Sequence, residues 1–445
     1  MCPKPTIALL HWGDVWEDFL DPIGVSLESF CNEGPGGWML GYIDALRLAG
    51  IRTVLFFISD RVKTPLRFKN IPAGATICVL PASKIYLSLR RRMLDPNGST
   101  AEEVFGQVQG TRRGIYAALK ILAPYLATPV VSLARELRSE QCKAVLCQEY
   151  EYARFDVCVA LGKLLHIPVF ATFQGGDRHL SRFEGLIRGL TMKASAGLII
   201  APQTEIGRVR LKYGLPSSKI ARIFNPIDLT MWGAADGSET RAALGIQSTA
   251  RVVAWHGRVD MHRKGLDILL DAWKIVCGER KGQDLLLLLV GTGKDADELH
   301  SRINTLQFHN VKWVNKYLTD RGTIKSYLSA ADIYVLPSRH EGFPVAPLEA
   351  MACGLPLVAA DAPGVPDILE ESERSGGIMV PRGDAEALAA ALGRVLDDAV
   401  RGRELGMFAR RRMETCFSVE EVGKQLRAFF IDRGAEFGKE KGDAV

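Results

Sequence analysis

Two glutamates, eight positions apart, flank a loop that is rich in glycine and proline. Glu341 and Glu349 belong to residues 335–360, VLPSRHEGFPVAPLEAMACGLPLVAA, where strand-like residues come before and after the loop. Gly342 lets a ligand approach the backbone, and successive N–H groups at the start of a helix attract phosphate oxygens. Carboxylates beside such a nest accept hydrogen bonds from ribose hydroxyls. The stretch therefore predicts a site for a ligand that carries both phosphate and ribose.

Two cations follow another strand-like run. Arg258 comes directly after RVVAWHG, and Lys264 stands six residues later, before a helical pattern. A guanidinium and an ammonium would offset the charge that grows on a departing diphosphate. A third turn, LLLVGTGKD, carries Gly291 and Gly293, which again allow close backbone approach. Each feature alone is common at protein surfaces, but their combination at successive strand ends indicates a nucleoside diphosphate site.

The elements that must position these residues alternate between strand and helix along the whole chain. Continuous apolar runs separated by segments of helical period indicate parallel sheets covered on both faces. The sequence thus predicts two doubly wound, Rossmann-like α/β domains facing each other across a cleft, with ligands at the carboxyl ends of the strands. The expected strands are TIALL, RTVLFFIS, ATICVL, AVLCQE, PVFATF, GLIIAP and IARIF in the first half, and RVVAWHG, DLLLLLVG, VKWV, ADIYVLP and PLVAAD in the second.

A chain of 445 residues exceeds what one hydrophobic core usually supports. Residues 231–249 interrupt the alternation with small and polar residues and are interpreted as a linker. They separate an N-terminal domain (1–230), expected to bind the acceptor, from a C-terminal domain (250–415), expected to bind the donor. A final amphipathic helix at 416–434 is expected to return to the first domain, and the polar residues 435–445 are expected to be a disordered tail.

The formal net charge of +5 is unevenly distributed. Residues 1–230 carry a net charge of +8 and the remainder carries −3, with local arginine clusters at 90–92 and 112–113. Such clusters are either solvated surface or sites of attraction to anionic lipid or an anionic acceptor. Peripheral membrane association through the basic half is therefore an additional expectation, whereas nucleic acid is not an expected partner.

Several classes of site are not indicated by the sequence. The nine cysteines are scattered without a CxxC pair, and His256 and His262 lack a third ligand nearby, so no metal is expected. No His-Glu-x-x-His pattern, Walker loop or nucleophile elbow occurs, and no dinucleotide glycine fingerprint follows the first strand of either domain. No signal peptide is evident and no apolar run approaches the roughly 20 residues of a spanning helix, which predicts a cytoplasmic protein.

Four segments together resemble the retaining glycosyltransferases of family 4, which have the GT-B fold and are related to glycogen synthase. The resemblance is dense from about residue 196 to residue 380 and looser before. Its most specific element is the pair of glutamates separated by seven residues, followed by MACGLPLVAA, with the arginine–lysine pair upstream. The segments are GLPSSKIARIFNPIDLTMW, HGRVDMHRKGLDILLDAW, LVGTGKDADEL and YLSAADIYVLPSRHEGFPVAPLEAMACGLPLVAADAPGVPDIL.

By matched position, the resemblance implies that Arg258 and Lys264 hold the donor diphosphate and are the main electrostatic catalysts. Glu341 would lie near the transferred sugar, and Glu349 would bind the ribose hydroxyls. The family retains the anomeric configuration, and the departing phosphate helps to deprotonate the incoming hydroxyl. It needs no metal, so no cofactor is expected besides the nucleotide-diphosphate sugar.

The remaining donor contacts implied by the resemblance come from backbone. Gly342 and Phe343 would contact the sugar and the phosphate, and the turn at Gly291 and Gly293 would complete the donor site. These assignments depend on matched position rather than on the residue types alone.

The N-terminal half is expected to receive the acceptor. Gly36 and Gly37, in NEGPGGWMLGYIDAL, match the glycine loop that faces the donor phosphates and the acceptor in this family. Gln174 stands where the family often has histidine, and its amide can still bind a sugar hydroxyl. Asp177 is expected either to orient the acceptor or to cap a helix.

These features predict a retaining, metal-independent glycosyltransferase that moves a hexosyl group from a nucleotide-diphosphate sugar to a glycan or lipid-linked acceptor. It is expected in the cytoplasm, with peripheral association at the inner face of the membrane. Two alternatives stay open: a hydrolysing nucleotide-sugar epimerase of the same architecture, and a non-catalytic module that binds a nucleotide sugar or a polysaccharide. The base, sugar and acceptor are not identified by the sequence.

Overall fold

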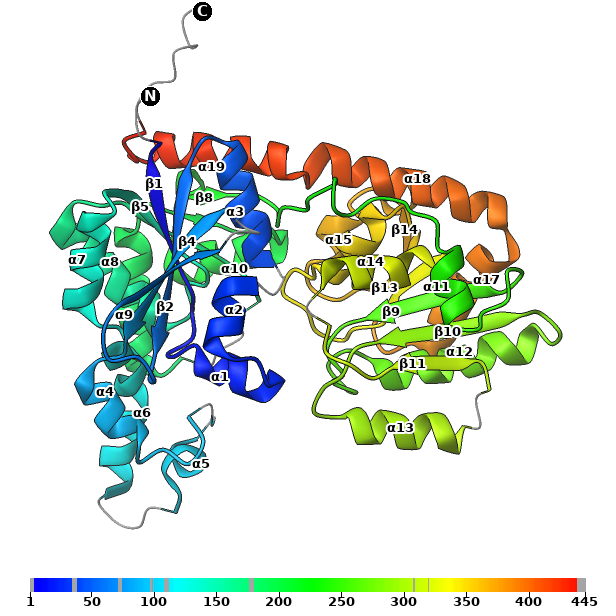
Figure 1. Ribbon diagram of the computed structural model, residues 1–445, viewed down its shortest axis with the longest axis horizontal. Coiled ribbons are helices and arrows are strands. Elements are labelled where there is room, and N and C mark those ends of the chain that lie inside the picture. Colours follow the sequence, from blue (N-terminus) through cyan, green and yellow to red (C-terminus); the bar gives the residue numbers. More distant parts are fainter. Residues whose placement is uncertain are drawn as a thin grey trace, which may run out of the picture.

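The protein consists of two α/β domains, each built on one mainly parallel sheet (Figure 1). The computed structural model describes residues 4–33, 38–70, 74–96, 98, 100–107, 112–175, 180–306, 309–318 and 320–437. The first sheet has eight strands in the order β3-β4-β2-β1-β5-β6-β7-β8, and the second has six in the order β11-β10-β9-β12-β13-β14. Among the described strands only β3 pairs in the antiparallel sense, with β4. The predicted fold class is confirmed.

The strands lie close to the apolar runs that predicted them, and most helices connect successive strands. The strands are β1 (Thr6–Leu10), β2 (Arg52–Ser59), β3 (Leu66–Asn70), β4 (Ala75–Pro81), β5 (Cys142–Cys147), β6 (Val169–Thr172), β7 (Gly197–Ile199), β8 (Ile220–Ala221), β9 (Arg251–His256), β10 (Leu285–Val290), β11 (Val311–Val314), β12 (Ile333–Leu336), β13 (Leu357–Ala360) and β14 (Gly377–Val380). The helices are α1 (Glu17–Leu20), α2 (Leu27–Glu33), α3 (Trp38–Leu48), α4 (Lys84–Arg90), α5 (Ala101–Phe105), α6 (Arg112–Ala127), α7 (Val130–Ser139), α8 (Ala153–Leu165), α9 (Arg182–Ala194), α10 (Gln203–Tyr213), α11 (Ser238–Ala243), α12 (Leu266–Glu279), α13 (Ala296–Thr305), α14 (Arg321–Ser329), α15 (Ala346–Ala352), α16 (Val365–Ile368), α17 (Ala385–Asp397), α18 (Ala399–Cys416) and α19 (Val419–Asp432).

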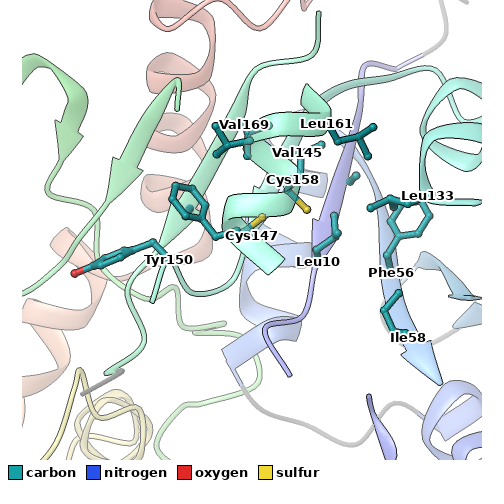
Figure 2. Packing of buried hydrophobic residues seen from close by; sticks show 14 of the residues in the cluster. Leu10, Phe56, Ile58, Leu133, Val145, Cys147, Tyr150, Cys158, Leu161 and Val169 are labelled. Atoms are coloured by element: carbon teal, nitrogen blue, oxygen red, sulfur yellow. The ribbon is translucent and has the colours of Figure 1, made fainter. Parts of the chain in front are cut away.

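Each face of the first sheet packs against its own layer of helices. One core joins strand residues to helices α4 and α6–α10, and the other joins the opposite face to α3 and α19. Figure 2 shows part of the first core, in which side chains of β1, β2 and β5 meet α7 and α8. The residues labelled there include Leu10, Phe56, Val145, Leu133 and Cys158. Because both faces are covered, the inner strands of this sheet are mainly apolar, as the sequence suggested.

Two strands were missed by the sequence analysis. β3 reads LRFKN, and its charged residues suit an edge strand exposed on one side. β14 reads GIMV and follows a glycine, so it resembles a turn more than a strand. Both strands lie at sheet edges, where local pattern is weakest.

The C-terminal helices connect the two domains. Helix α18 packs on the second domain, and α19 then lies against α3 of the first, as Figure 1 shows in orange and red respectively. The contact is close, because a Cβ on Gly423 would come within 2.3 Å of the Ala45 carbonyl oxygen. The predicted tail begins too early, since Ala435 and Phe437 are buried in the same core. Within the expected linker, Trp232 and Ile246 are buried in a core of the second domain.

One helical stretch is long and apolar enough to span a membrane by length and composition. It covers Arg113–Ser139, where α6 and α7 meet, and only 22% of its most apolar window is buried. The expectation that no run approaches this length is wrong for this segment. Ala123, Ala127, Leu133 and Leu137 nevertheless belong to the first core, so the stretch is packed as part of the domain.

His11 gives the first domain a specific pH dependence. Its Nδ1 accepts a hydrogen bond from the Gly13 amide at 3.0 Å. Burial, followed by the charge of Arg154, lowers the pKa of His11 well below its usual 6.5. As the pH falls below 6.5, His11 takes up a proton in the unfolded chain before it does so in the native protein. The free energy of unfolding therefore decreases as the pH falls.

We expect the stability advantage of the native protein over a His11→Phe variant to shrink in urea titrations between pH 7.5 and pH 5.5. The slope should not exceed about 1.4 kcal/mol per pH unit, the value for one proton. A constant difference across this range would show that His11 does not titrate differently in the two states.

Candidate active site

Two loops at the carboxyl edge of the second sheet are held against each other. They follow β9 and β12 and comprise residues 257–265 and 337–345. Gly265 has a φ of +65°, and a Cβ there would lie 2.0 Å from the Pro337 carbonyl oxygen. The amides of Arg339 and His340 donate to the Arg263 carbonyl at 3.0 and 3.3 Å. These contacts fix the relative position of the loops that carry the predicted cations and carboxylate.

The predicted lysine and glutamate meet directly. Lys264 Nζ donates to Glu341 Oε1 at 2.7 Å and to Oε2 at 2.9 Å. Ser338 Oγ donates to Oε1 at 2.7 Å, so three bonds orient a carboxylate whose residue is only 7% exposed. The sequence placed Lys264 and Glu341 at neighbouring strand ends, and the structure brings their charged groups into contact.

A cavity of about 260 Å³ opens beside this pair. Its wall includes Lys264, Glu341, Gly342 and Phe343 of the second domain and Gln174 of the first. The cavity therefore lies between the domains, at the strand ends where the sequence analysis expected ligands.

Two further wall residues, His256 and Arg263, were missed as binding residues. Arg263 makes no side-chain hydrogen bond or ion pair within the described ranges. It directly precedes Lys264, so a second cation in the same loop was the signal that could have identified it.

Arg258 is exposed on the same loop and does not line the cavity. Its guanidinium makes no hydrogen bond or ion pair with the part of the chain that the structure describes. Burial raises the pKa of Tyr317, and the charge of Arg258 opposes that rise, which places the two side chains near each other. Arg258 is thus an exposed cation on the loop beside the cavity, with no ion pair to any described residue.

The glycines after β10 have a packing role. Gly291 has a φ of +132°, and a Cβ on it would lie 1.9 Å from the Gly257 carbonyl oxygen. A Cβ on Gly293 would lie 2.1 Å from the Val259 carbonyl oxygen. Only glycine lets this loop pack against the one that carries Arg258. The sequence analysis expected these glycines to let the backbone approach a ligand closely. In the structure the close approach is to the backbone of the neighbouring loop.

Glu349 lies in the first turn of α15 and contacts His256. Glu349 Oε2 is 2.9 Å from His256 Nε2, and the other ring nitrogen, Nδ1, is buried without a partner among the described residues. His256 ends β9 and was considered in the sequence only as a metal ligand. No group of metal-ligating side chains occurs in the described ranges.

On the side of the first domain, Gln174 is already engaged. Its amide nitrogen donates to Asn225 Oδ1 at 3.2 Å, and its oxygen accepts from Asn225 Nδ2 at 3.1 Å. The neighbouring Gly175 packs closely against the second domain, because a Cβ on Gly342 would lie 2.1 Å from Gly175 Cα. The other residues expected near the acceptor, Gly36, Gly37 and Asp177, lie outside the described residues.

Comparison with known sequences supports the resemblance. Residues 250–398 match the family described as glycosyl transferases group 1. A GDP-mannose-dependent monoacylated alpha-(1-6)-phosphatidylinositol monomannoside mannosyltransferase from Corynebacterium glutamicum is 33% identical over 219 residues, covering 48% of this chain and 54% of that protein. The alpha-maltose-1-phosphate synthase of Mycolicibacterium smegmatis is 30% identical over 224 residues, which cover 47% of this chain and 56% of that protein. The chain thus spans about half the length of these relatives.

Comparison with solved structures extends over nearly the whole chain. The sucrose-phosphate synthase of Thermosynechococcus elongatus has a TM-score of 0.68 at 18% identity, covering 96% of this chain and 99% of that one. Anabaena HepE, solved in complex with UDP, has a TM-score of 0.68 at 18% identity, covering 96% and 100%. At this identity the likeness concerns the fold. Residues 250–398 are thus similar to the glycosyl transferases group 1, and the two domains of the chain together form the GT-B fold.

Proposed function

We propose that this protein is a retaining, metal-independent glycosyltransferase that moves a hexosyl group from a nucleotide-diphosphate sugar to a hydroxyl of a glycan or lipid-linked acceptor. The observation that carries the proposal is the Lys264–Glu341 pair in a cavity between the two domains. An ammonium held by a buried carboxylate has a fixed direction, and a fixed cation is suited to a charge that appears only during reaction. The relative named as a mannosyltransferase supports the same class of reaction.

In the proposed reaction the donor diphosphate lies against the loop of Arg258, Arg263 and Lys264. The bond between the anomeric carbon and the diphosphate oxygen breaks, and that oxygen keeps the electron pair. The acceptor hydroxyl attacks from the same face and its proton passes to the departing phosphate, so the configuration is retained. The three cations offset the negative charge that the diphosphate gains.

No metal enters this scheme because the loop itself supplies positive charge. Arg258 and Arg263 make no ion pair within the described ranges, and Lys264 is held by Glu341, so the loop offers two unpaired guanidinium groups and one oriented ammonium to a diphosphate. We therefore expect donor binding to be insensitive to a chelator.

The ribose role of Glu349 predicts a specific kinetic change. Glu349→Ala is expected to raise the donor KM by about 10- to 100-fold, the value of a lost hydrogen bond to a charged group, with a smaller change in kcat. Initial rates over a range of donor concentrations would measure both. His256→Asn, which keeps a polar side chain beside Glu349, should raise KM less. A lost kcat with an unchanged KM would instead place Glu349 in the chemical step.

A thermal-shift panel tests the proposal as a whole. UDP, GDP and ADP sugars would each be added to the full chain, with and without EDTA. We expect one nucleotide to raise the melting temperature in a concentration-dependent way, with no effect of EDTA. Stabilisation that EDTA removes would contradict metal independence, and no stabilisation by any nucleotide sugar would contradict the donor class.

The location of the reaction is also a proposal. A lipid-linked acceptor and the basic first domain suit a cytoplasmic enzyme that associates with the inner face of the membrane. Vesicle binding by the full chain would test this association.

A further inference from the structure

The outer face of α9 carries apolar side chains where a surface helix is normally polar. Phe183, Leu186 and Leu190 are 51%, 67% and 63% exposed, and their spacing places them along one side of the helix. The residues Glu184, Arg188 and Met192 are buried on the inner side. The exposed stripe is therefore a surplus of apolar surface beyond what the fold uses.

The charges around this stripe are of one sign. Arg182 and Lys193 are exposed at the two ends of α9. Its single acidic residue, Glu184, is buried and accepts hydrogen bonds from the Ser181 amide and hydroxyl at 2.9 and 2.7 Å. An apolar face bounded by cations, without exposed carboxylates on the same helix, is typical of a helix lying in an anionic lipid interface.

Helix α6 has a similar stripe. Ile115 and Leu122 are 60% and 42% exposed, with Ala118 exposed between them. This helix begins the stretch that is apolar enough to span a membrane. Because Ala123 and Ala127 are packed in the first core, the exposed residues can enter a lipid surface while the helix stays in the fold.

The two helices flank one turn of α8. Tyr125 of α6 donates to Asp156 Oδ2 at 2.9 Å, and Arg188 of α9 donates to both oxygens of the same carboxylate at 2.9 Å. Both helices contribute to the core on one face of the sheet, so they belong to one layer. Figure 1 shows this layer on the side of the first domain that is turned away from the second.

We propose that the outer faces of α6 and α9 form a docking surface for an anionic lipid bilayer. The proposal deepens the proposed function, because it rests on a membrane-bound acceptor for the same active site. Lipid headgroups would pair with Arg182 and Lys193, and Phe183, Leu186 and Leu190 would enter the acyl boundary.

The charge argues for a bilayer rather than a second copy of the chain. Within residues 182–213 four cations are exposed, whereas Arg188 and Arg208 are paired with carboxylates of the fold; the exposed cations are Arg182, Lys193, Arg210 and Lys212. Both acids of this segment are engaged internally: Glu184 caps its helix, and Glu205 pairs with Arg208 at 2.6 Å. Two such faces would repel each other, whereas an anionic surface complements them.

The surface is also close to the site. Helix α9 begins seven residues after Gly175, where the two domains touch. Seven residues span at most about 25 Å. The start of α9 therefore lies within that distance of the segment that carries Gln174, a wall residue of the cavity, which suits a lipid-linked acceptor.

Vesicle co-sedimentation of the full chain tests the docking surface. Vesicles of phosphatidylcholine alone would be compared with vesicles containing 30% phosphatidylglycerol, at low and high salt. We expect binding to the anionic vesicles that weakens at high salt. Leu186→Gln combined with Leu190→Gln should weaken it by about tenfold or more. Arg182→Gln combined with Lys193→Gln should reduce its dependence on anionic lipid.

The matched control is Val400→Gln combined with Met407→Gln. These side chains are 69% and 65% exposed on α18 of the second domain, so their change should leave vesicle binding unaltered. Far-UV circular dichroism would confirm that each variant is folded. Equal binding by the wild type and the α9 variants, or no binding to either vesicle, would overturn the proposal. Concentration-dependent dimerisation that the leucine changes abolish would assign the face to self-association.

The thermal-shift experiment with nucleotide sugars distinguishes a failure of the docking surface from a failure of the proposed function. If a nucleotide sugar stabilises the protein while vesicles do not bind, only the docking surface is wrong. If no nucleotide sugar stabilises it, the proposed function fails whatever the vesicles show.

Discussion

Replacing Lys264 with alanine is expected to lower the initial rate of nucleoside diphosphate release by about 10²–10³-fold, the scale for losing one preorganised charge contact. The ammonium lies 2.7 and 2.9 Å from the two oxygens of Glu341, so its position is set before the substrate arrives. The loss should fall mainly on kcat, because the cation meets its full counter-charge only as the diphosphate departs. Steady-state kinetics with the stabilising donor would measure it.

Lys274→Ala is the matched control, since it removes an exposed lysine from α12 of the same domain. Its rate should stay close to that of the wild type. Arg258→Ala is expected to lower the rate of nucleoside diphosphate release by a factor in the same range as Lys264→Ala, although the Arg258 side chain is exposed. Near-normal rates in both the Arg258 and the Lys264 variants would contradict the assigned roles.

Asp156→Ala is expected to destabilise the protein by about 3–5 kcal/mol, the range for breaking a buried ion pair from one side. Asp156 and Arg188 are 4% and 1% exposed, and the guanidinium donates two bonds of 2.9 Å to the carboxylate. Without Asp156 the arginine would stay buried with an uncompensated charge. Tyr125 would also lose its acceptor. Urea unfolding followed by circular dichroism would measure the change.

Asp271→Ala provides the comparison on the surface. Its partner Arg302 lies 3.0 Å away, and both side chains are substantially exposed. Its loss should cost only about 0–1 kcal/mol. If the two variants lost the same small amount of stability, the buried network would not be a main support of the first domain.

The fold could be predicted from sequence wherever a strand is buried on both faces. β2 and β10 are continuous apolar runs, and the helix α15 begins beside Pro347 and is followed by Gly354 at a φ of +83°. β3 escaped because most of its side chains are exposed and two are charged, and β14 escaped because it has only four residues and begins with glycine. Their pairing depends on the neighbouring strand rather than on their own pattern.

The site was predictable only where its residues lie in loops that directly follow strands at one edge of the sheet. Lys264 and Glu341 follow β9 and β12, which are neighbours in the sheet, so their meeting follows from the order of the strands. The contact of His256 with Glu349 joins residues 93 positions apart. The pairing of Gln174 with Asn225 joins the end of β6 to the junction of the domains. Neither contact can be recognised from a pattern in the local sequence, because both depend on side-chain directions in the folded protein.

Calorimetric titration of nucleoside diphosphate against the matching monophosphate tests the central claim most directly. If the loop of Arg258 and Lys264 holds the diphosphate, the wild type should bind the diphosphate more tightly by about tenfold or more, the worth of one charge-assisted contact. The Arg258→Ala, Lys264→Ala double variant should lose that preference while still binding the nucleoside portion. An equal preference in both proteins would contradict the account.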